Sequence, residues 1–369
     1  MFQYQQLVKH VLETGTRKEN RTGVDTISTF NYNYEIDLAD GFPLLTTKSI
    51  SWKNIVIEML WFLSGQTDIS ILKRHGCKFW DAWADPVSGK VPSAYGHFWR
   101  EFPVHGWAGT IDHPESNAAN DQIDWVLSEL RRNPMSRRMV VSAWAPGNAQ
   151  TSKLPPCHTM FVLNVQDVSP YKQHAPKYLH CNAHNVQPDY KSPVCGKEDG
   201  HREGLYLRDG ELWCPDCQEI LWKKGGAKGF QNPPKDADYR RLCLHLTQRS
   251  CDVALGVPYN IASYALLLSI FSHLSGIKPG IFAHTLVDAH IYTKKPDGSM
   301  AEYDHIPGLE EQIKREPRAL PKLIINPAIK ELSDIEALMR PEVTTDEVMR
   351  HFKLEGYDPH PAIPFKVAV

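Results

Sequence analysis

The chain has 369 residues, enough for one large domain with an insertion or for two domains. Hydrophobic residues make up 42% of it and the formal net charge is −2, which suits a globular protein and argues against a whole-surface nucleic-acid binder. The most apolar run, Ile261 to Leu274, is interrupted by polar residues and predicts a buried helix, not a membrane span. The N-terminus lacks a basic segment followed by an apolar core, so no secretory signal is expected and a cytoplasmic location is predicted.

Periodic patterns predict helices and strands along most of the chain. Helical periodicity is found over Gln3–Gly15, Trp52–Ser64, Asp121–Arg132 and Asn260–Ser275. Strand-forming residues are found over Thr26–Ile36, Met139–Ala143, His158–Val165, Leu242–Thr247 and Leu323–Ile325. These elements do not follow the regular rhythm of a doubly wound fold, so an α+β fold is predicted.

Residues 166–241 interrupt this pattern, because they are rich in Lys, Pro, Gly, Asp, His and Cys and poor in long apolar runs. We predict that they form a Cys/His-rich inserted subdomain, and that residues 1–165 and 242–369 form one domain around it. Cys214 and Cys217 have the tight spacing of a zinc knuckle, and Cys181 and Cys195 supply the second pair that zinc needs. The spacing of that second pair is too long for a standard knuckle. A structural zinc site and four unpaired thiols are equally compatible with the segment.

Cys157 stands apart from the other cysteines, because it follows Pro155 and Pro156 at the start of a predicted strand. Two prolines fix the backbone near the extended region and hold the next residue rigidly. A thiol becomes a useful nucleophile when positive neighbours stabilise its thiolate. His158 is adjacent, but consecutive strand residues point to opposite faces, so the imidazole need not contact the thiol.

Two charged residues lie in apolar surroundings. Glu58 sits in an apolar helix and is either exposed on the one polar face or placed in a pocket; the pattern alone favours exposure. Arg249 lies between an apolar strand and an apolar segment, beside the hydroxyl of Ser250. A guanidinium and a neighbouring hydroxyl suit phosphate oxygens.

Three further polar residues have two interpretations each. Asn260 at the start of a long helix is either an N-cap or an amide that pairs with the edge of uracil. His290 and Tyr292 are expected to point the same way from a strand. They hold a sugar hydroxyl or line a hydrated sheet face.

Motifs in a consistent order resemble the thymidylate synthase family, and they cover nearly everything outside the insertion and some loops. They are Asn20–Gly23, Asp40–Lys48, Glu58–Leu63, Trp80–Trp83, Ser136–Arg138, Pro156–His158, Gln248–Asp252, Asn260–Ala265 and Gly356–Pro361. The resemblance implies a mixed β-sheet with flanking helices.

By that resemblance, Cys157 attacks carbon 6 of the uracil ring of dUMP, and carbon 5 then attacks the methylene of 5,10-methylenetetrahydrofolate. Glu58 becomes an organiser of proton transfer through water, with a pKa raised by its apolar neighbours. The residues implied in catalysis are Cys157, Glu58, Tyr95, His158, Arg249, Asp252 and Asn260.

The resemblance also implies binding residues for both ligands. Those for the nucleotide are Arg21, Arg137, Arg138, Gln248, Ser250, Asn260, His290 and Tyr292. Arg137 and Arg138 would come from the second subunit of a homodimer. Those for the folate are Trp80, Trp83, Asp252, Gly256, Tyr259 and Val369.

The chain departs from the family pattern at Ala145, Ala254, Val287 and Lys294–Lys295. The relatives include nucleotide hydroxymethylases, in which water rather than hydride meets the exocyclic methylene. Retention of Trp80 and Val369 favours hydride transfer and dTMP, whereas the altered pocket edges favour 5-hydroxymethyl-dUMP. A non-catalytic RNA or protein binder is a third interpretation; the retained nucleophile and phosphate arginines argue against it as the main role, and no DNA is required.

Overall fold

The structure is a computed structural model that describes residues 1–20, 22–103, 119–149, 152–167, 206–208, 211–213, 220–222 and 239–368. The chain divides into two compact units, Met1–Val165 with Leu242–Val369, and Gln166–Arg241. In the second unit the described residues form a three-stranded sheet of β7 (Tyr206–Arg208), β8 (Glu211–Trp213) and β9 (Ile220–Trp222). The sequence patterns did not predict these short strands.

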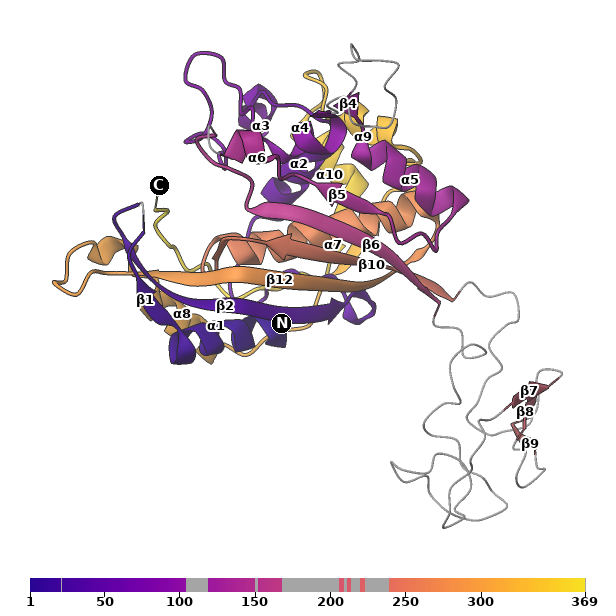
Figure 1. The fold of residues 1–369 in the computed structure, drawn as a ribbon, viewed down its shortest axis with the longest axis horizontal. Coiled ribbons are helices and arrows are strands. Elements are labelled where there is room, and N and C mark those ends of the chain that lie inside the picture. Colours follow the sequence, from indigo (N-terminus) through magenta and orange to yellow (C-terminus); the bar gives the residue numbers. More distant parts are fainter. Residues whose placement is uncertain are drawn as a thin grey trace. The chain divides into compact units, whose positions relative to one another are not determined.

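A seven-stranded sheet forms the centre of the first unit (Figure 1). Its order is β1 (Thr16–Lys18), β2 (Asp25–Asp37), β12 (Lys278–Thr293), β10 (Arg240–Gln248), β6 (His158–Asp167) and β5 (Val140–Ser142), with β11 (Cys251–Asp252) paired to β12. The pairing of β2 with β12 is antiparallel and that of β11 with β12 is parallel. The predicted α+β fold with a mixed sheet is therefore confirmed.

Helices flank this sheet. They are α1 (Phe2–Thr14), α2 (Trp52–Leu63), α3 (Ser70–Arg74), α4 (Tyr95–Arg100), α5 (Gln122–Arg132), α6 (Pro146–Ala149), α7 (Gly256–Ser275), α8 (Ile306–Lys314), α9 (Leu332–Leu338) and α10 (Thr345–His351). Two short strand pairs accompany them, β3 (Phe102–Pro103) with β4 (Ala119–Asn120) and β13 (Lys322–Ile325) with β14 (Phe352–Glu355). Within the described residues, none of the helices has the length and apolar character that crossing a bilayer needs.

The sheet has one fully buried face, as the alternation along β10 illustrates. Leu242, Leu244 and Leu246 are completely buried, whereas Cys243 and His245 between them are half-buried. Helix α7 packs against β12 and also contacts α2 and α5, so it lies at the centre of the core (Figure 1). This arrangement explains why α7 is apolar nearly all round.

Helix α7 begins at Gly256, four residues before its predicted start, so the interpretation of Asn260 as an N-cap is wrong. Pro258 lies in the first turn, where a proline costs no intrahelical hydrogen bond. Asp252 Oδ1 accepts hydrogen bonds from the backbone N–H groups of Ala254 and Leu255 just before the helix, at 2.9 and 3.1 Å. Asn260 therefore lies inside the helix, one turn beyond its start, and its side chain is available for other partners.

Helices α2 and α4 approach each other closely at Gly96. A Cβ atom at this position would lie 2.4 Å from the carbonyl oxygen of Phe62 and 2.9 Å from its Cα. Only a glycine allows this contact between the two backbones. The contact fixes α4, which carries Tyr95, against α2, which carries Glu58.

Gly96→Ala is expected to destabilise the protein by about 1–3 kcal/mol, because the added methyl group meets backbone atoms that cannot move separately. Urea denaturation of the variant beside the wild type measures this. Gly147→Ala is the matched control, since nothing lies within 4 Å of a Cβ at Gly147. Equal urea midpoints for the wild type, Gly96→Ala and Gly147→Ala would show that α2 and α4 can move apart without loss of stability.

Candidate active site around Cys157

Cys157 is half-buried and lies immediately before β6. Hydrogen bonds of its backbone hold it in place. Its N–H donates to the hydroxyl oxygen of Tyr95 at 3.0 Å, and its carbonyl oxygen accepts from the N–H of Arg249 at 2.8 Å. The described cysteines, including Cys157, are thiols. The two backbone bonds therefore fix the backbone of Cys157 between Tyr95 on α4 and Arg249 just after β10.

The guanidinium of Arg249 stabilises the segment that precedes the thiol. Its Nε donates to the carbonyl oxygen of Pro156 at 2.9 Å, and Nη2 donates to that of Pro155 at 2.8 Å. The group also lies over the ring of Trp144, 5.5 Å from the ring centre. A guanidinium has several N–H donors, so Arg249 can bind this segment and still donate to an anion.

Tyr95 and His158 form a buried pair beside Cys157. The two rings stack with centres 4.7 Å apart, and the Tyr95 hydroxyl also accepts from the N–H of His158 at 3.4 Å. Burial raises the pKa of Tyr95 above its usual range, so the phenol stays protonated. Burial lowers the pKa of His158 to about 4, partly opposed by a hydrogen bond with Asn260, so the imidazole is neutral near pH 7. His158 Nδ1 is buried with no hydrogen-bond partner among the described residues.

Glu58 is half-buried on α2, and its Oε1 accepts a hydrogen bond from Trp80 Nε1 at 2.7 Å. The exposed position that the helix pattern favours is therefore wrong, because Trp80 packs over this face of α2. Burial raises the pKa of Glu58 from its ordinary 4.5 to about 7, although the bond from Trp80 works in the opposite direction. This carboxyl can give up or accept a proton near neutral pH.

Trp80 and Tyr259 lie near Glu58, and the backbone N–H of Trp83 donates to the Trp80 carbonyl oxygen; we refer to these aromatic residues as the aromatic wall. Trp80 is buried, whereas Trp83 and Tyr259 are half-buried. Phe79 contacts Tyr259 with ring centres 5.0 Å apart, although the sequence motif did not single it out. Its position next to Trp80 is the signal that could have found it. Such a wall suits a flat heterocycle.

Lys48 is a second residue that the site prediction missed. It is buried, its Nζ donates to the carbonyl oxygen of Ala254 at 2.6 Å, and it lies 4.6 Å from the ring centre of Phe365. Burial lowers its pKa to about 8, and the nearby carboxylate of Asp252 opposes the shift. Lys48 ends the motif Asp40–Lys48, which could have marked it.

The remaining predicted residues lie on β10, β11, β12 and α7. Gln248 Nε2 donates to Asn260 Oδ1 and to the carbonyl oxygen of Ser250, at 3.0 Å in both cases. The rings of His290 and Tyr292 are 5.4 Å apart on one face of β12, as their spacing predicts. Asp252 pairs with His290 in the sheet, and Gly256 begins α7.

Several predicted residues are not joined to this cluster. Arg137 and Arg138 are exposed between α5 and β5, and no contact within the described part of the chain joins them to Cys157. Outside the described residues lie Arg21, Val369, Cys181, Cys195, Cys214 and Cys217. Among the residues that are described, no group of three or more His, Cys, Asp and Glu side chains could hold a metal ion.

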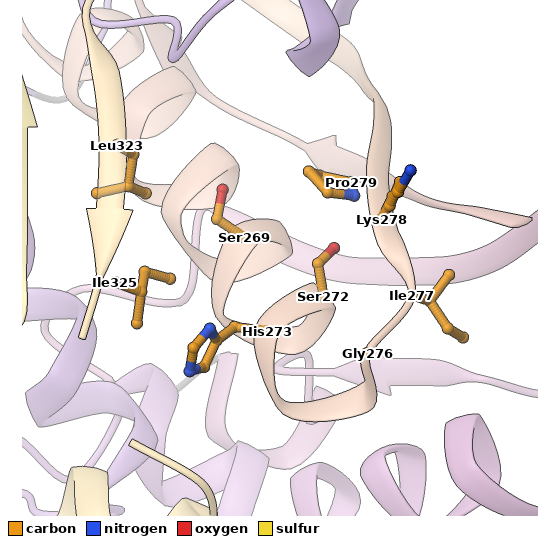
Figure 2. Close-up of a pocket in the computed structure, with 9 residues that line it drawn as sticks. All are labelled: Ser269, Ser272, His273, Gly276, Ile277, Lys278, Pro279, Leu323 and Ile325. Carbon is orange, nitrogen blue, oxygen red and sulfur yellow. The ribbon is translucent and has the colours of Figure 1, made fainter. Parts of the chain in front are cut away.

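A cavity of about 410 Å³ lies elsewhere, at the C-terminal end of α7. Figure 2 shows Ser269, Ser272 and His273 on the helix, between Leu323 of β13 and Lys278 of β12. None of the residues that line the cavity belongs to the cluster around Cys157. The candidate site is therefore defined by its chemical groups and their contacts, not by this cavity.

Comparison with known protein families gives one match that spans most of the chain. A family model described as thymidylate synthase matches residues 2–188 and 229–369. The matched ranges include Cys157, Glu58, Tyr95 and Arg249 and extend into both ends of the inserted unit.

Glu58→Gln is expected to make the protein more stable than the wild type at alkaline pH. A carboxyl whose pKa is raised on folding favours the folded state below its unfolded pKa of 4.5 and loses that advantage as the pH rises through 7. Keeping the ionised carboxylate buried destabilises the folded wild type by at most roughly 3 kcal/mol, since Glu58 keeps some contact with solvent. The neutral amide of the variant avoids this cost. Urea denaturation at pH 5.5 and 8.5 measures the difference.

The exposed Glu13→Gln on α1 is the matched control and should leave the pH dependence unchanged. If Glu58→Gln and the wild type lost stability in parallel between the two pH values, the carboxyl would titrate in its ordinary range.

Proposed function

The chain belongs to the thymidylate synthase family, whose members transfer a one-carbon unit to dUMP, and we propose that it is a thymidylate synthase that makes dTMP. The one-carbon donor in this proposal is 5,10-methylenetetrahydrofolate. The observation that carries the proposal is a pair of backbone hydrogen bonds that hold Cys157 against the Tyr95 hydroxyl and the Arg249 N–H, at 3.0 and 2.8 Å. The guanidinium of Arg249 donates to the two carbonyl oxygens just before Cys157. A rigid nucleophile thereby lies beside a guanidinium suited to the phosphate of the nucleotide.

Cys157 is proposed to add its sulfur to carbon 6 of the uracil ring, which raises the electron density at carbon 5. The folate would supply the methylene that carbon 5 attacks. Loss of the carbon 5 proton would then release tetrahydrofolate from the methylene, and hydride transfer from tetrahydrofolate would complete the methyl group, leave dihydrofolate and allow the sulfur to leave carbon 6. Arg249, with Arg21 and Ser250, would bind the phosphate, and His290 and Tyr292 would bind the sugar. The guanidinium proposed to bind the phosphate is hydrogen-bonded to the segment that carries the thiol, and this fixed placement favours reaction by orientation.

Glu58 is proposed to organise proton transfer through water. Its pKa of about 7 suits a group that must exchange protons near neutral pH. Tyr95 accepts two backbone N–H bonds and keeps its own hydroxyl proton for donation, while neutral His158 adds a further polar group. The three residues would act as one network around the ring of the nucleotide.

The aromatic wall next to Glu58 fits a pterin ring, because Trp83 and Tyr259 are only half-buried. Asp252 and Gly256 would complete the folate site at the start of α7. Trp80 is buried and bonds Glu58. Its indole ring would help to exclude water from the exocyclic methylene, which supports hydride transfer over hydration.

A homodimer is part of the proposal, with Arg137 and Arg138 completing the phosphate site of the other subunit. Both arginines are exposed, and no contact within the described residues joins them to Cys157. Strands β2 and β6 also carry apolar side chains at the surface, with Phe30 83% exposed and Met160 40% exposed. Such a face is suited to burial against a second copy.

Incubation of the purified protein with dUMP and 5,10-methylenetetrahydrofolate is expected to give dTMP and dihydrofolate in equal amounts. Mass spectrometry of the nucleotide and the change in folate absorbance measure the two products. Cys157→Ser should form neither product and still bind dUMP, because the hydroxyl is a much weaker nucleophile than the thiolate.

Formation of 5-hydroxymethyl-dUMP with tetrahydrofolate, and no dihydrofolate, would instead identify the protein as a dUMP hydroxymethylase. Undiminished turnover by Cys157→Ser would contradict the covalent mechanism for both the synthase and the hydroxymethylase reaction.

A structural zinc ion in the inserted unit is a separate prediction, because all four proposed ligands lie outside the described residues. Elemental analysis of the purified protein should find about one zinc per chain, bound by Cys181, Cys195, Cys214 and Cys217. Replacing Cys214 and Cys217 with serine should remove it. Zinc-free protein with four reactive thiols would contradict the site, and Cys77→Ser is the control for a buried thiol outside the unit.

A further inference from the structure

A continuous chain of buried hydrogen bonds runs from β2 to the residue expected to read the base. The Tyr34 hydroxyl lies 2.7 Å from His284 Nδ1, and His284 Nε2 lies 3.0 Å from Gln248 Oε1. Gln248 Nε2 then donates to Asn260 Oδ1 at 3.0 Å. Tyr34, His284 and Gln248 are 8%, 1% and 2% exposed, so water does not compete for these bonds.

The direction of every bond in this chain follows from one backbone carbonyl. Gln248 Nε2 also donates to the carbonyl oxygen of Ser250 at 3.0 Å, and a carbonyl oxygen can only accept. The amide oxygen of Gln248 must therefore face His284, whose Nε2 carries the proton that it donates. His284 Nδ1 is then an acceptor, and the Tyr34 hydroxyl donates to it.

His284 can keep this arrangement because it has a single ring proton. Burial, with smaller effects from His158 and His245, lowers the pKa of His284 well below its usual range, so the ring is neutral. A neutral imidazole has one donor and one acceptor, and both are used here.

The consequence for Asn260 is a preferred orientation of its amide. Its Oδ1 faces the donor on Gln248, so a flip of the amide would bring two N–H groups together. In the observed orientation the amide can donate to oxygen 4 of uracil and accept from nitrogen 3. Cytosine presents an acceptor at nitrogen 3 and a donor at position 4, and it would require the flipped amide.

We propose that Tyr34 and His284 are positioning residues that act through Gln248 to hold the Asn260 amide in the orientation that selects uracil over cytosine. The inference rests on the proposed function, because it presumes that a pyrimidine nucleotide binds beside Cys157. Neither residue belongs to the predicted site, and neither contacts the nucleotide in this proposal.

The test compares the dissociation constants for dUMP and dCMP, measured by calorimetric titration of each protein. The wild type should bind dUMP far more tightly. His284→Met removes the donor and leaves the Gln248 oxygen buried without a partner, which should lower the dCMP-to-dUMP ratio of dissociation constants on the order of tenfold. His284→Gln keeps a donor near the position of Nε2 and should restore the ratio.

His245→Met is the matched control. His245 lies on β10, half-buried, and bonds Thr285 Oγ1 at 2.8 Å outside the chain of bonds to Asn260. The ratio for this variant should equal that of the wild type. Tyr34→Phe removes only the first donor and should lower the ratio in the same direction, so it carries the test if His284→Met does not fold.

A parallel loss of affinity for both nucleotides in His284→Met or Tyr34→Phe would show a purely structural role and overturn the inference. In that case the wild-type preference for dUMP would still support the proposed function. A wild type that binds no dUMP would overturn both.

Discussion

The hydroxyl oxygen of Tyr95 accepts the N–H groups of two successive residues, Cys157 and His158, and so determines where β6 begins. Tyr95 itself is placed by α4, which can approach α2 only because Gly96 has no side chain. Helix α2 carries Glu58, and Trp80 packs over it. The nucleophile, the buried phenol and the titrating carboxyl therefore depend on one close contact between two helices.

Burial then sets the protonation states around the thiol. The same loss of water raises the pKa of Glu58 to about 7 and lowers that of His158 to about 4, because desolvation disfavours whichever form is charged. Glu58 can thereby exchange protons near neutral pH, whereas His158 stays neutral there. A similar effect keeps His284 neutral, which allows its two nitrogens to have opposite roles.

Local patterns predicted helices α1, α2, α5 and α7, strands β2, β5, β6, β10 and β13, and the position of Cys157 at a strand start. Of β12 they predicted only the part around His290 and Tyr292. They failed where the deciding partner is distant along the chain. Glu58 was expected on an exposed face because Trp80, which covers it, lies in another segment. An N-cap was one of two interpretations of Asn260, because the apolar pattern begins there, whereas α7 begins at Gly256 with Pro258 in its first turn. Tyr34 and His284 could not have been found, since they are separated by 250 positions and meet only when β2 pairs with β12.

Arg249 has a consequence for how substrate and enzyme influence each other. Its guanidinium bonds the carbonyl oxygens of Pro155 and Pro156, and the same group is the proposed ligand of a phosphate. Whatever binds this cation also changes the conformational freedom of the segment before Cys157, and thermodynamic linkage makes the effect mutual. The nucleotide would then restrict the motion of the residue that attacks it, and a thiol already held in place would in turn increase affinity for the nucleotide.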